Sequence, residues 1–190
     1  MLDNGLHSGN SKLHSPEWVP IGNPELTDKR TRYVVPIAPG GVLNDYVPFY
    51  FTPRSVMMMN IVTGRGVKQR QREEIVILVS SLHQLQRQGL PFVFTDSHAY
   101  CQWAPFYHDL ADLPNIDWPL LQSLDFRRVP DDPARFERYQ AEALVHQHCP
   151  VSALIGMICY SDDITMEVTQ QIQQRGLTLP VYTRPGCYHP

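Results

Sequence analysis

A run of aromatic residues bounded by glycine and proline most constrains how this chain can fold. Gly40 and Gly41 precede a segment rich in aromatic and β-branched residues, and Pro53 follows it. The glycines tolerate positive φ and the proline cannot continue a ladder, so the pattern predicts a strand at about residues 46–52 between two loops. Successive side chains of a strand alternate, so aromatic rings must lie on both faces. One face packs the core, and the other is either a second buried face or the wall of a cleft for a planar ring.

Length and charge narrow the class of protein. The 190 residues, 43% of them hydrophobic, predict one domain, residues 1–190, around one core. A formal net charge of −3 excludes an overall cationic surface, so any surface that binds nucleic acid must be local. The 17 prolines favour many loops and short strands over a helical bundle.

The spacing of the cysteines and the length of the apolar runs indicate whether the chain binds a metal, whether it spans a membrane and in which compartment it acts. The four cysteines form no C-x-x-C pair, the chain opens without a basic segment followed by an apolar run, and no apolar run approaches the ~20 residues that span a bilayer. We therefore expect no membrane association and a cytoplasmic protein with reduced thiols. His146, His148 and Cys149 have the spacing of metal ligands, but Pro150 follows and the sequence suggests no fourth ligand, so we predict no metal site.

The remaining periodicity predicts a mixture of strands and helices. Continuous apolar residues at 75–79 are typical of a strand buried on both faces, and a helix capped by Ser80 or Ser81 is followed by a strand at 91–95. The middle of the chain is expected to form helical pieces at 106–113 and 118–123, a helix at 134–139 and a strand at 141–145. The C-terminal part is expected to form a strand at 157–160, a helix at 162–175 and a strand at 179–183. This order indicates a fold that combines both kinds of element.

Polar stretches leave function open on composition alone. Residues 9–39 lack a sustained period apart from one helical turn at about 23–29, and a loop of that length is usually functional or disordered. Its basic tip at 29–32 is either part of a functional loop or a solvated charge cluster. The basic, glycine-containing run at 64–72 either lies along phosphates or is a mobile solvated hairpin. The aromatics and cations of 99–133 either stack on single-stranded nucleic acid or anchor a long loop to the core.

Four segments carry a resemblance to a known family. They occur in order at residues 40–55, 73–80, 90–98 and 136–145, and the likeness extends from about Leu2 to the C-terminus. In these segments the chain resembles the DarT family, the DNA ADP-ribosyltransferase toxins of bacterial toxin–antitoxin pairs. The resemblance implies an α+β fold of the ADP-ribosyltransferase type, with a mixed, mainly antiparallel split sheet, surrounding helices and long loops.

The resemblance also implies a reaction and partners. Family members transfer ADP-ribose from NAD to thymidine bases of single-stranded DNA in a sequence-selective manner, and a DarG antitoxin with an ADP-ribosyl-removing macrodomain opposes them. We therefore expect a toxin with NAD as donor and single-stranded DNA as acceptor. Roughly the first two dozen family residues, which include the first strand, have no counterpart before Met1. The alternative is a non-catalytic or impaired remnant that binds DNA or the antitoxin, and a transferase directed at protein or RNA is a third possibility.

Five residues are expected in the site. Glu142 stands among small and apolar residues, so on sequence alone its carboxylate is either exposed on an edge strand or held in a site. The resemblance implies that Glu142 is catalytic, and that Arg30, from the long N-terminal loop, is both catalytic and NAD-binding. It also suggests Ser8, Tyr46 and His98 as cofactor-binding residues.

The chemistry of the implied reaction explains these residue types. Cleavage of the nicotinamide–ribose bond passes through an oxocarbenium-like species, which a carboxylate near the ribose stabilises electrostatically. The ring nitrogen of thymine is a poor nucleophile until it loses its proton. Arginine is almost never deprotonated in proteins, so we expect Arg30 to bind the NAD phosphates and to stabilise the developing thymine anion rather than to accept the proton.

Overall fold

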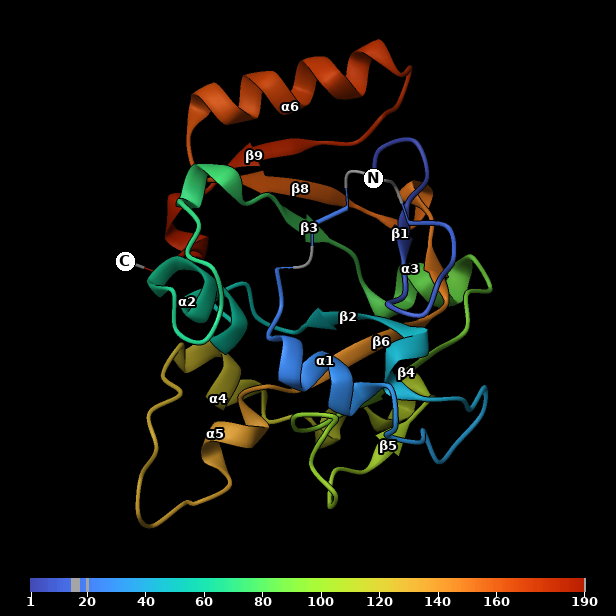
Figure 1. Ribbon diagram of the computed structural model, residues 1–190, viewed down its shortest axis with the longest axis vertical. Coiled ribbons are helices and arrows are strands. Elements are labelled where there is room, and N and C mark those ends of the chain that lie inside the picture. The colour runs from blue at the N-terminus through green and yellow to red at the C-terminus, as the bar shows by residue number, and fades with distance from the viewer. Residues whose placement is uncertain (15–17, 20, 190) are drawn as a thin grey trace.

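The computed structural model describes residues 1–14, 18–19 and 21–189, whose strands pair into three sheets (Figure 1). A two-stranded sheet joins β1 (Leu6–His7) to β7 (His148–Cys149). A four-stranded sheet has the order β2 (Tyr46–Tyr50), β6 (Glu142–His146), β4 (Phe92–Thr95) and β5 (Phe106–Tyr107). A three-stranded sheet has the order β3 (Ile77–Val79), β8 (Gly156–Cys159) and β9 (Val181–Thr183). These strands pair antiparallel except for β8 with β9, so the predicted mixed, mainly antiparallel split sheet is confirmed.

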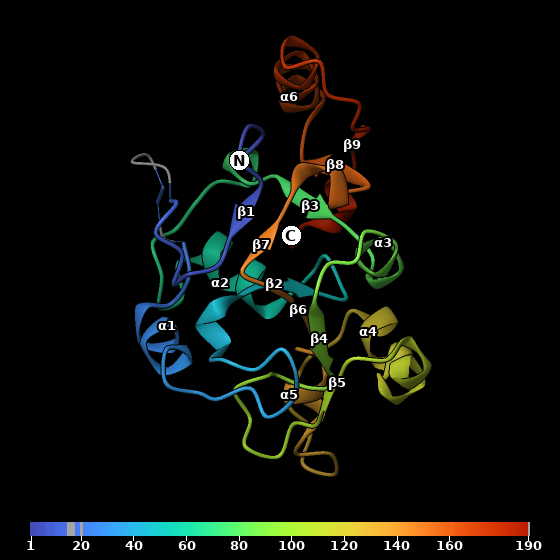
Figure 2. The ribbon, with the colours of Figure 1, turned by 90° about the vertical axis from the view of Figure 1, so that its right-hand side faces the viewer.

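Six helices in the described residues surround the sheets. They are α1 (Pro24–Arg30), α2 (Val56–Thr63), α3 (Leu82–Arg87), α4 (Trp118–Ser123), α5 (Arg135–Arg138) and α6 (Asp162–Gln174). The longest of them, α6, packs on β8 and β9 of the three-stranded sheet. Side-chain caps explain four of the starts, because a backbone N–H in the first turn of α1, α2, α3 and α4 donates to Asn23, Ser55, Ser81 and Asp117, respectively. Figure 2 shows α1 on one side of the four-stranded sheet and α3 and α4 on the other. None of the helices in the described residues is both long and apolar enough to span a membrane.

The four-stranded sheet separates two clusters of apolar side chains. Cross-strand partners share a face, and the register places Tyr50 directly opposite Glu142. The main core receives Val47, Phe92, Phe94, Ala143 and Val145 from one face. The opposite face, which carries Glu142, contributes Tyr46, Val93 and Leu144 to a second cluster with Val35, Leu43 and Ala99. The expected core face is thus confirmed, whereas β2 is an edge strand, so the alternative of a fully buried central strand is wrong.

Two expected elements differ from the structure, and one helix was not expected. β3 is the edge strand of its sheet and is only partly buried, so burial on both faces was wrong. Helix α2 occupies an apolar stretch for which no helix was expected; Ser55 caps its start and Gly64, at φ +72°, ends it. Within 106–113, pairing of β5 with β4 replaces the first expected helical turn, because tertiary contacts override weak local preference.

A mainly apolar cavity of about 720 Å³ lies between β2 and β3. Its walls include Met57 and Ile61 of α2. Both strands are edges of their sheets, so the sheets face each other here without pairing. Binding sites combine apolar walls with a few convergent polar groups, and an apolar hollow offers little to a charged dinucleotide. The face that carries Glu142 is therefore the better candidate.

Candidate active site

Glu142 opens strand β6 with its carboxylate inside the protein. The side chain is 1% exposed, and its Oε2 lies 3.1 Å from Nη1 of Arg30. Oε1 accepts a hydrogen bond of 3.2 Å from the backbone N–H of Ala99. A buried carboxylate is costly unless it is paired and hydrogen-bonded, and both conditions are met. Of the two alternatives from sequence, the exposed glutamate is wrong and the held carboxylate is confirmed.

Arg30 reaches this carboxylate from the end of α1. It is the last residue of the helix and lies 112 positions before Glu142 in the chain. Its Nη2 donates to the backbone carbonyl of Leu43 at 3.4 Å, so the guanidinium joins the carboxylate to the turn before β2. Salt screens a buried pair much less than an exposed one, and only 11% of the Arg30 side chain is exposed. The structure thus brings the two residues expected to be catalytic into direct contact.

His98 touches the same carboxylate without donating to it. Its Nδ1 lies 3.6 Å from Oε1 of Glu142 but accepts a hydrogen bond of 3.1 Å from the N–H of Tyr100. A ring nitrogen that accepts carries no proton, so the contact with Glu142 is neither a hydrogen bond nor an ion pair. We assign the proton of the ring to Nε2 on this basis. His98 therefore lies beside the site, with Nε2 as a donor for a ligand.

Tyr50 is a neighbour of Glu142 that sequence reasoning did not single out. The two residues are cross-strand partners, and within the described residues the hydroxyl of Tyr50 makes one hydrogen bond, a weak one of 4.0 Å to the sulfur of Met57. Burial, and then the charge of Glu142, raises the pKa of Tyr50 well above its usual value, so the phenol stays protonated at neutral pH. Its position in the strand could have indicated this role, because Tyr50 lies four residues after Tyr46 and therefore on the same strand face.

Tyr46, which was expected to contact NAD, is buried beneath the turn that precedes β2. It is 1% exposed, and its hydroxyl donates to the carbonyl of Gly40 at 2.6 Å. Gly40 and Gly41 adopt φ values of 82° and 80°, which only glycine adopts readily, so Tyr46 pins a turn that the glycine pair makes possible. Burial, followed by the charge of Asp45, raises the pKa of Tyr46 to about 12. These contacts favour a supporting role, and a cofactor contact by Tyr46 stays a prediction.

Replacing Tyr46 with Phe distinguishes the two roles. The variant leaves the Gly40 carbonyl without its donor, so we expect the free energy of unfolding to fall by about 1–2 kcal/mol. The Kd for NAD should stay the same. Chemical denaturation and NAD titration measure the two quantities separately. Weaker NAD binding at unchanged stability would instead identify Tyr46 as a direct contact.

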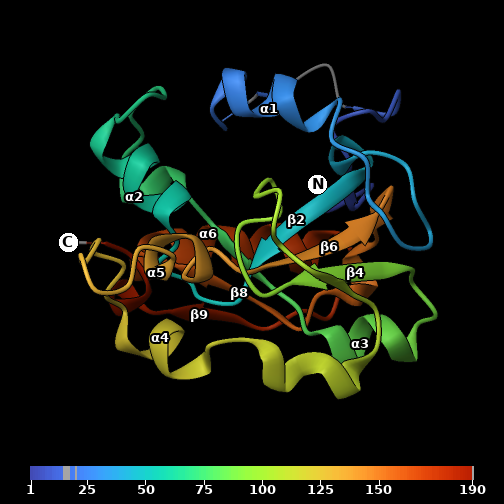
Figure 3. The ribbon, with the colours of Figure 1, turned by 90° about the horizontal axis from the view of Figure 1, so that it is seen from below.

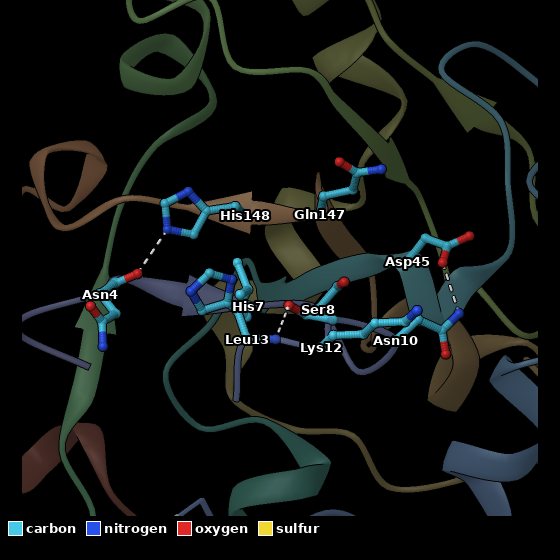
Figure 4. A pocket seen from close by; sticks show the side chains of 10 residues that line it. Asn4, His7, Ser8, Asn10, Lys12, Leu13, Asp45, Gln147 and His148 are labelled. Carbon is cyan, nitrogen blue, oxygen red and sulfur yellow. Dashed lines mark hydrogen bonds between the residues drawn. The ribbon is translucent and has the colours of Figure 1, made fainter. Parts of the chain in front are cut away.

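Ser8 lines a polar hollow at the other end of β6. The hollow has a volume of about 710 Å³, and its walls also carry His7, Asn10, Lys12 and His148 (Figure 4). Ser8 is held there because its backbone N–H donates to the carbonyl of Gln147 at 2.8 Å. Gln147 follows β6, five residues after Glu142, so the hollow and the carboxylate are separated by about 17 Å of strand.

The histidines and cysteine that end β6 and form β7 do not converge. The ring of His146 lies 5.0 Å from that of Tyr46, and the ring of His148 stacks 4.5 Å from that of His7. Cys149 is buried in the main core. Within residues 1–14, 18–19 and 21–189, no group of three or more His, Cys, Asp or Glu side chains is placed to hold a metal ion.

Comparison with known proteins identifies the family. Residues 1–189 match the sequence profile of the family described as ssDNA thymidine ADP-ribosyltransferase, DarT. The chain belongs to the DarT family. The resemblance and the α+β fold class expected from the sequence are therefore confirmed.

Relatives and solved DarT structures agree with this assignment. The chain is 58% identical over 189 residues to a DNA ADP-ribosyl transferase of Escherichia coli O127:H6 (strain E2348/69 / EPEC), which covers 99% of this chain and 87% of the relative. A DNA ADP-ribosyl transferase of Thermus sp. (strain 2.9) is 38% identical over 159 residues, or 84% of this chain and 75% of the relative. Thermus sp. 2.9 DarT in complex with ADP-ribosylated ssDNA matches with a TM-score of 0.89 at 34% identity, covering 98% of this chain and 88% of that one. Its complex with NAD+ matches with a TM-score of 0.85 at 33% identity, covering 98% and 89%.

The site of this DarT chain is assembled from segments that are remote in sequence. The end of α1, the loop after β4 and the start of β6 meet around one carboxylate. Figure 3 shows α1 and α2 on the side of the sheet where this site lies. The carboxylate is oriented by a cation and a backbone N–H, and the neutral donors of His98 and Tyr50 lie beside it. Such an arrangement can stabilise positive charge that develops on a sugar.

Proposed function

We propose that this chain transfers ADP-ribose from NAD to thymidine bases of single-stranded DNA, with Glu142 as the catalytic carboxylate. The observation that carries the proposal is the buried Glu142, held by Arg30 and Ala99, in a chain of the DarT family. Thermus sp. 2.9 DarT is known in complex with NAD+ and with ADP-ribosylated ssDNA. These relatives support both the donor and the acceptor.

In this reaction the bond between ribose C1′ and the nicotinamide nitrogen breaks, and nicotinamide leaves as a neutral molecule. Positive charge develops at C1′, and the Glu142 carboxylate stabilises it electrostatically. Arg30 and Ala99 fix the carboxylate before the reaction begins, so little reorganisation is needed at the moment of charge development. A ring nitrogen of thymine then forms the new bond to C1′, and its proton passes to solvent.

Arg30 has two tasks in the proposed mechanism. Its guanidinium presents several donors in a planar fork, which suits the phosphates of NAD and the oxygens of a thymine anion. In the structure this fork already serves two acceptors, Glu142 and the Leu43 carbonyl. We therefore assign Arg30 to phosphate binding and to stabilisation of the anion, and not to acceptance of the proton.

We further propose that NAD extends from Glu142 towards the hollow lined by Ser8. His98 Nε2 would donate at the nicotinamide end, close to the carboxylate. At the far end, His7 offers a ring to stack on, and Asn10 and Lys12 offer donors for oxygens. The separation of about 17 Å along β6 suits two nucleosides joined by a pyrophosphate.

A competition among acceptors tests the proposed function. Single-stranded DNA that contains thymidine, RNA of the matching sequence, and an unrelated protein are incubated together with the enzyme and labelled NAD. We expect label on the DNA alone. Label on RNA or protein in preference to DNA would instead support a transferase with a different acceptor.

NAD-dependent thermal stabilisation separates an enzyme from a non-catalytic remnant. A ligand that binds only the folded state increases the free energy of unfolding, by about 2.7 kcal/mol at a ligand concentration a hundred times Kd. The melting temperature rises as a result. We expect the melting temperature to rise with NAD concentration. A melting temperature that does not respond to NAD, together with intact DNA binding, would favour the remnant.

Trp103 is the exposed aromatic of the loop that follows Ala99. It is 56% exposed, whereas Tyr107, Trp118 and Phe126 pack against the main core and anchor their segments. The hydroxyl of Tyr33 donates to the carbonyl of Cys101 at 3.0 Å and fixes the base of this loop. An exposed ring on a fixed loop beside the site can stack on a nucleobase.

Replacing Trp103 with Ala is therefore expected to weaken the use of DNA. Stacking on one base is worth about 1–3 kcal/mol, so KM for the oligonucleotide should rise by a factor of about 5 to 160. The thermal shift that NAD produces should not change. Tyr182→Ala removes a similarly exposed ring from β9 and should leave KM unaltered. An equal effect of both changes would argue against stacking by Trp103.

We also propose that the chain acts as the toxin of a toxin–antitoxin pair in the cytoplasm, where its DNA substrate is present. The partner that the family resemblance implies is a DarG-like antitoxin with a macrodomain. Co-expression tests this partner, since a macrodomain that removes ADP-ribose should restore growth and strip the label from DNA.

A further inference from the structure

The basic segment at residues 64–72, which we call the 64–72 loop, carries cations without partners. It contains no acidic residue. Arg70 pairs with Glu74, and Arg72 donates to the carbonyl of His189, but Arg65 and Lys68 are exposed, with no side-chain hydrogen bond or ion pair in the part of the chain that the structure describes. Two positive charges therefore remain for a ligand.

The 64–72 loop is folded back on α2 rather than free in solvent. The backbone N–H of Arg65 donates to Asn60 at 2.9 Å, the side chain of Gln69 donates to Val62 at 2.9 Å, and the N–H of Arg70 donates to Ile61 at 3.1 Å. Of the alternatives that the sequence left open, a mobile hairpin does not fit these contacts. The backbone that carries Arg65 and Lys68 is thus held against α2.

The loop also lies against the helix that carries Arg30. A Cβ placed on Gly66 would lie 3.5 Å from the side-chain nitrogen of Asn23, the residue that caps α1. Arg30 ends this seven-residue helix, about 10 Å further along its axis. Figure 3 shows α1 and α2 on the same side of the sheets. The loop therefore lies on the rim of the candidate active site.

Other cations near this rim are already neutralised. Lys29 pairs with Glu25 and Arg32 pairs with Asp28, both across one turn of α1 or at its end. The net charge of the whole chain is −3, so attraction for a polyanion depends on local patches. Within the described residues of this rim, Arg65 and Lys68 are the cations of the 64–72 loop that neither an acidic side chain nor a carbonyl engages, since Arg70 pairs with Glu74 and Arg72 donates to the carbonyl of His189.

We propose that the 64–72 loop binds the phosphate backbone of single-stranded DNA about three nucleotides from the target thymidine, through Arg65 and Lys68. The spacing follows from about 10 Å of helix and a rise of ~3.4 Å per nucleotide in a stacked strand. Phosphates are the anions that recur at this spacing along DNA, whereas NAD carries a single pyrophosphate, which we have assigned to Arg30. This inference rests on the proposed function and extends it to the path of the DNA.

The test compares the double variant Arg65→Ala/Lys68→Ala with wild type on two oligonucleotides. One is about fifteen nucleotides long with a central thymidine, and the other is a core too short to reach the loop, with about one nucleotide on each side of the thymidine. Each lost phosphate contact lowers the salt dependence of binding to a single strand by ~0.7. We expect a roughly tenfold or larger loss of affinity for the long oligonucleotide near 0.1 M salt, and a shallower salt slope by about 1.4.

The controls make each outcome decisive. Arg87→Ala/Arg184→Ala removes the same charge from α3 and from the residue after β9, and should leave affinity unchanged. Wild type and Arg65→Ala/Lys68→Ala should bind the short oligonucleotide with the same affinity. NAD should raise the melting temperature of both proteins by the same amount. Equal affinity of the double variant and wild type for the long oligonucleotide would overturn the inference alone, as would a loss confined to NAD. No transfer by wild type to either oligonucleotide would overturn the proposed function as well.

Discussion

Glu142→Gln is expected to reduce transfer of ADP-ribose by about a hundred- to a thousandfold, with little change in the Kd for NAD. The amide is almost the same size as the carboxylate, but it is neutral and cannot stabilise positive charge at C1′. Losses of that size are typical when a preorganised electrostatic group is removed from a transition state. Single-turnover measurement of labelled DNA gives the rate of the chemical step directly.

The fold of Glu142→Gln should survive, which keeps this result interpretable. The amide oxygen can still accept from Arg30, and the contact that suffers is the one with the N–H of Ala99. We expect cooperative unfolding and a normal thermal shift with NAD. Glu167→Gln on α6 is the matched control, because that side chain is exposed and far from the site. A rate of Glu142→Gln close to wild type would remove Glu142 from the mechanism.

Arg30→Ala is expected to lose both activity and stability. It leaves the Glu142 carboxylate buried without its cation, and breaking a buried pair from one side typically costs about 3–5 kcal/mol. It also removes the donors proposed for the NAD phosphates and for the thymine anion. Chemical denaturation should show the loss of stability, and transfer should fall at least about a hundredfold.

A double replacement separates these two effects. Arg30→Met/Glu142→Gln contains no buried charge at this position, so most of the lost stability should return while activity stays absent. Arg30→Lys keeps the charge but loses the planar fork that reaches Glu142 and the Leu43 carbonyl together, so its activity should remain well below wild type. Recovery of transfer in the double variant would remove both Arg30 and Glu142 from the catalytic mechanism.

Local patterns were sufficient to predict the elements that carry the site. The alternation of side chains in a strand placed Glu142 and Leu144 on one face, and β6 has that geometry. The helical turn at 23–29 corresponds to α1, because Asn23 is a strong capping residue and Pro24 suits the first turn. These rules depend only on neighbours in sequence.

Features that depend on distant contacts were not predictable in the same way. The pairing of Arg30 with Glu142 spans 112 positions, and only the family resemblance placed the two together. The N–H of Ala99 belongs to a backbone position, so no residue type marks it. The site around Tyr50 requires knowledge of strand register, which the hydrophobic pattern of one strand does not fix.

The most direct test of the account is the mass of a thymidine-containing single-stranded oligonucleotide after incubation with the enzyme and NAD. We predict a gain of one ADP-ribose on a thymine base with wild type, no gain when every thymidine is replaced, and almost none with Glu142→Gln. An unchanged mass with wild-type protein that is stabilised by NAD, or a full gain with Glu142→Gln, would contradict it.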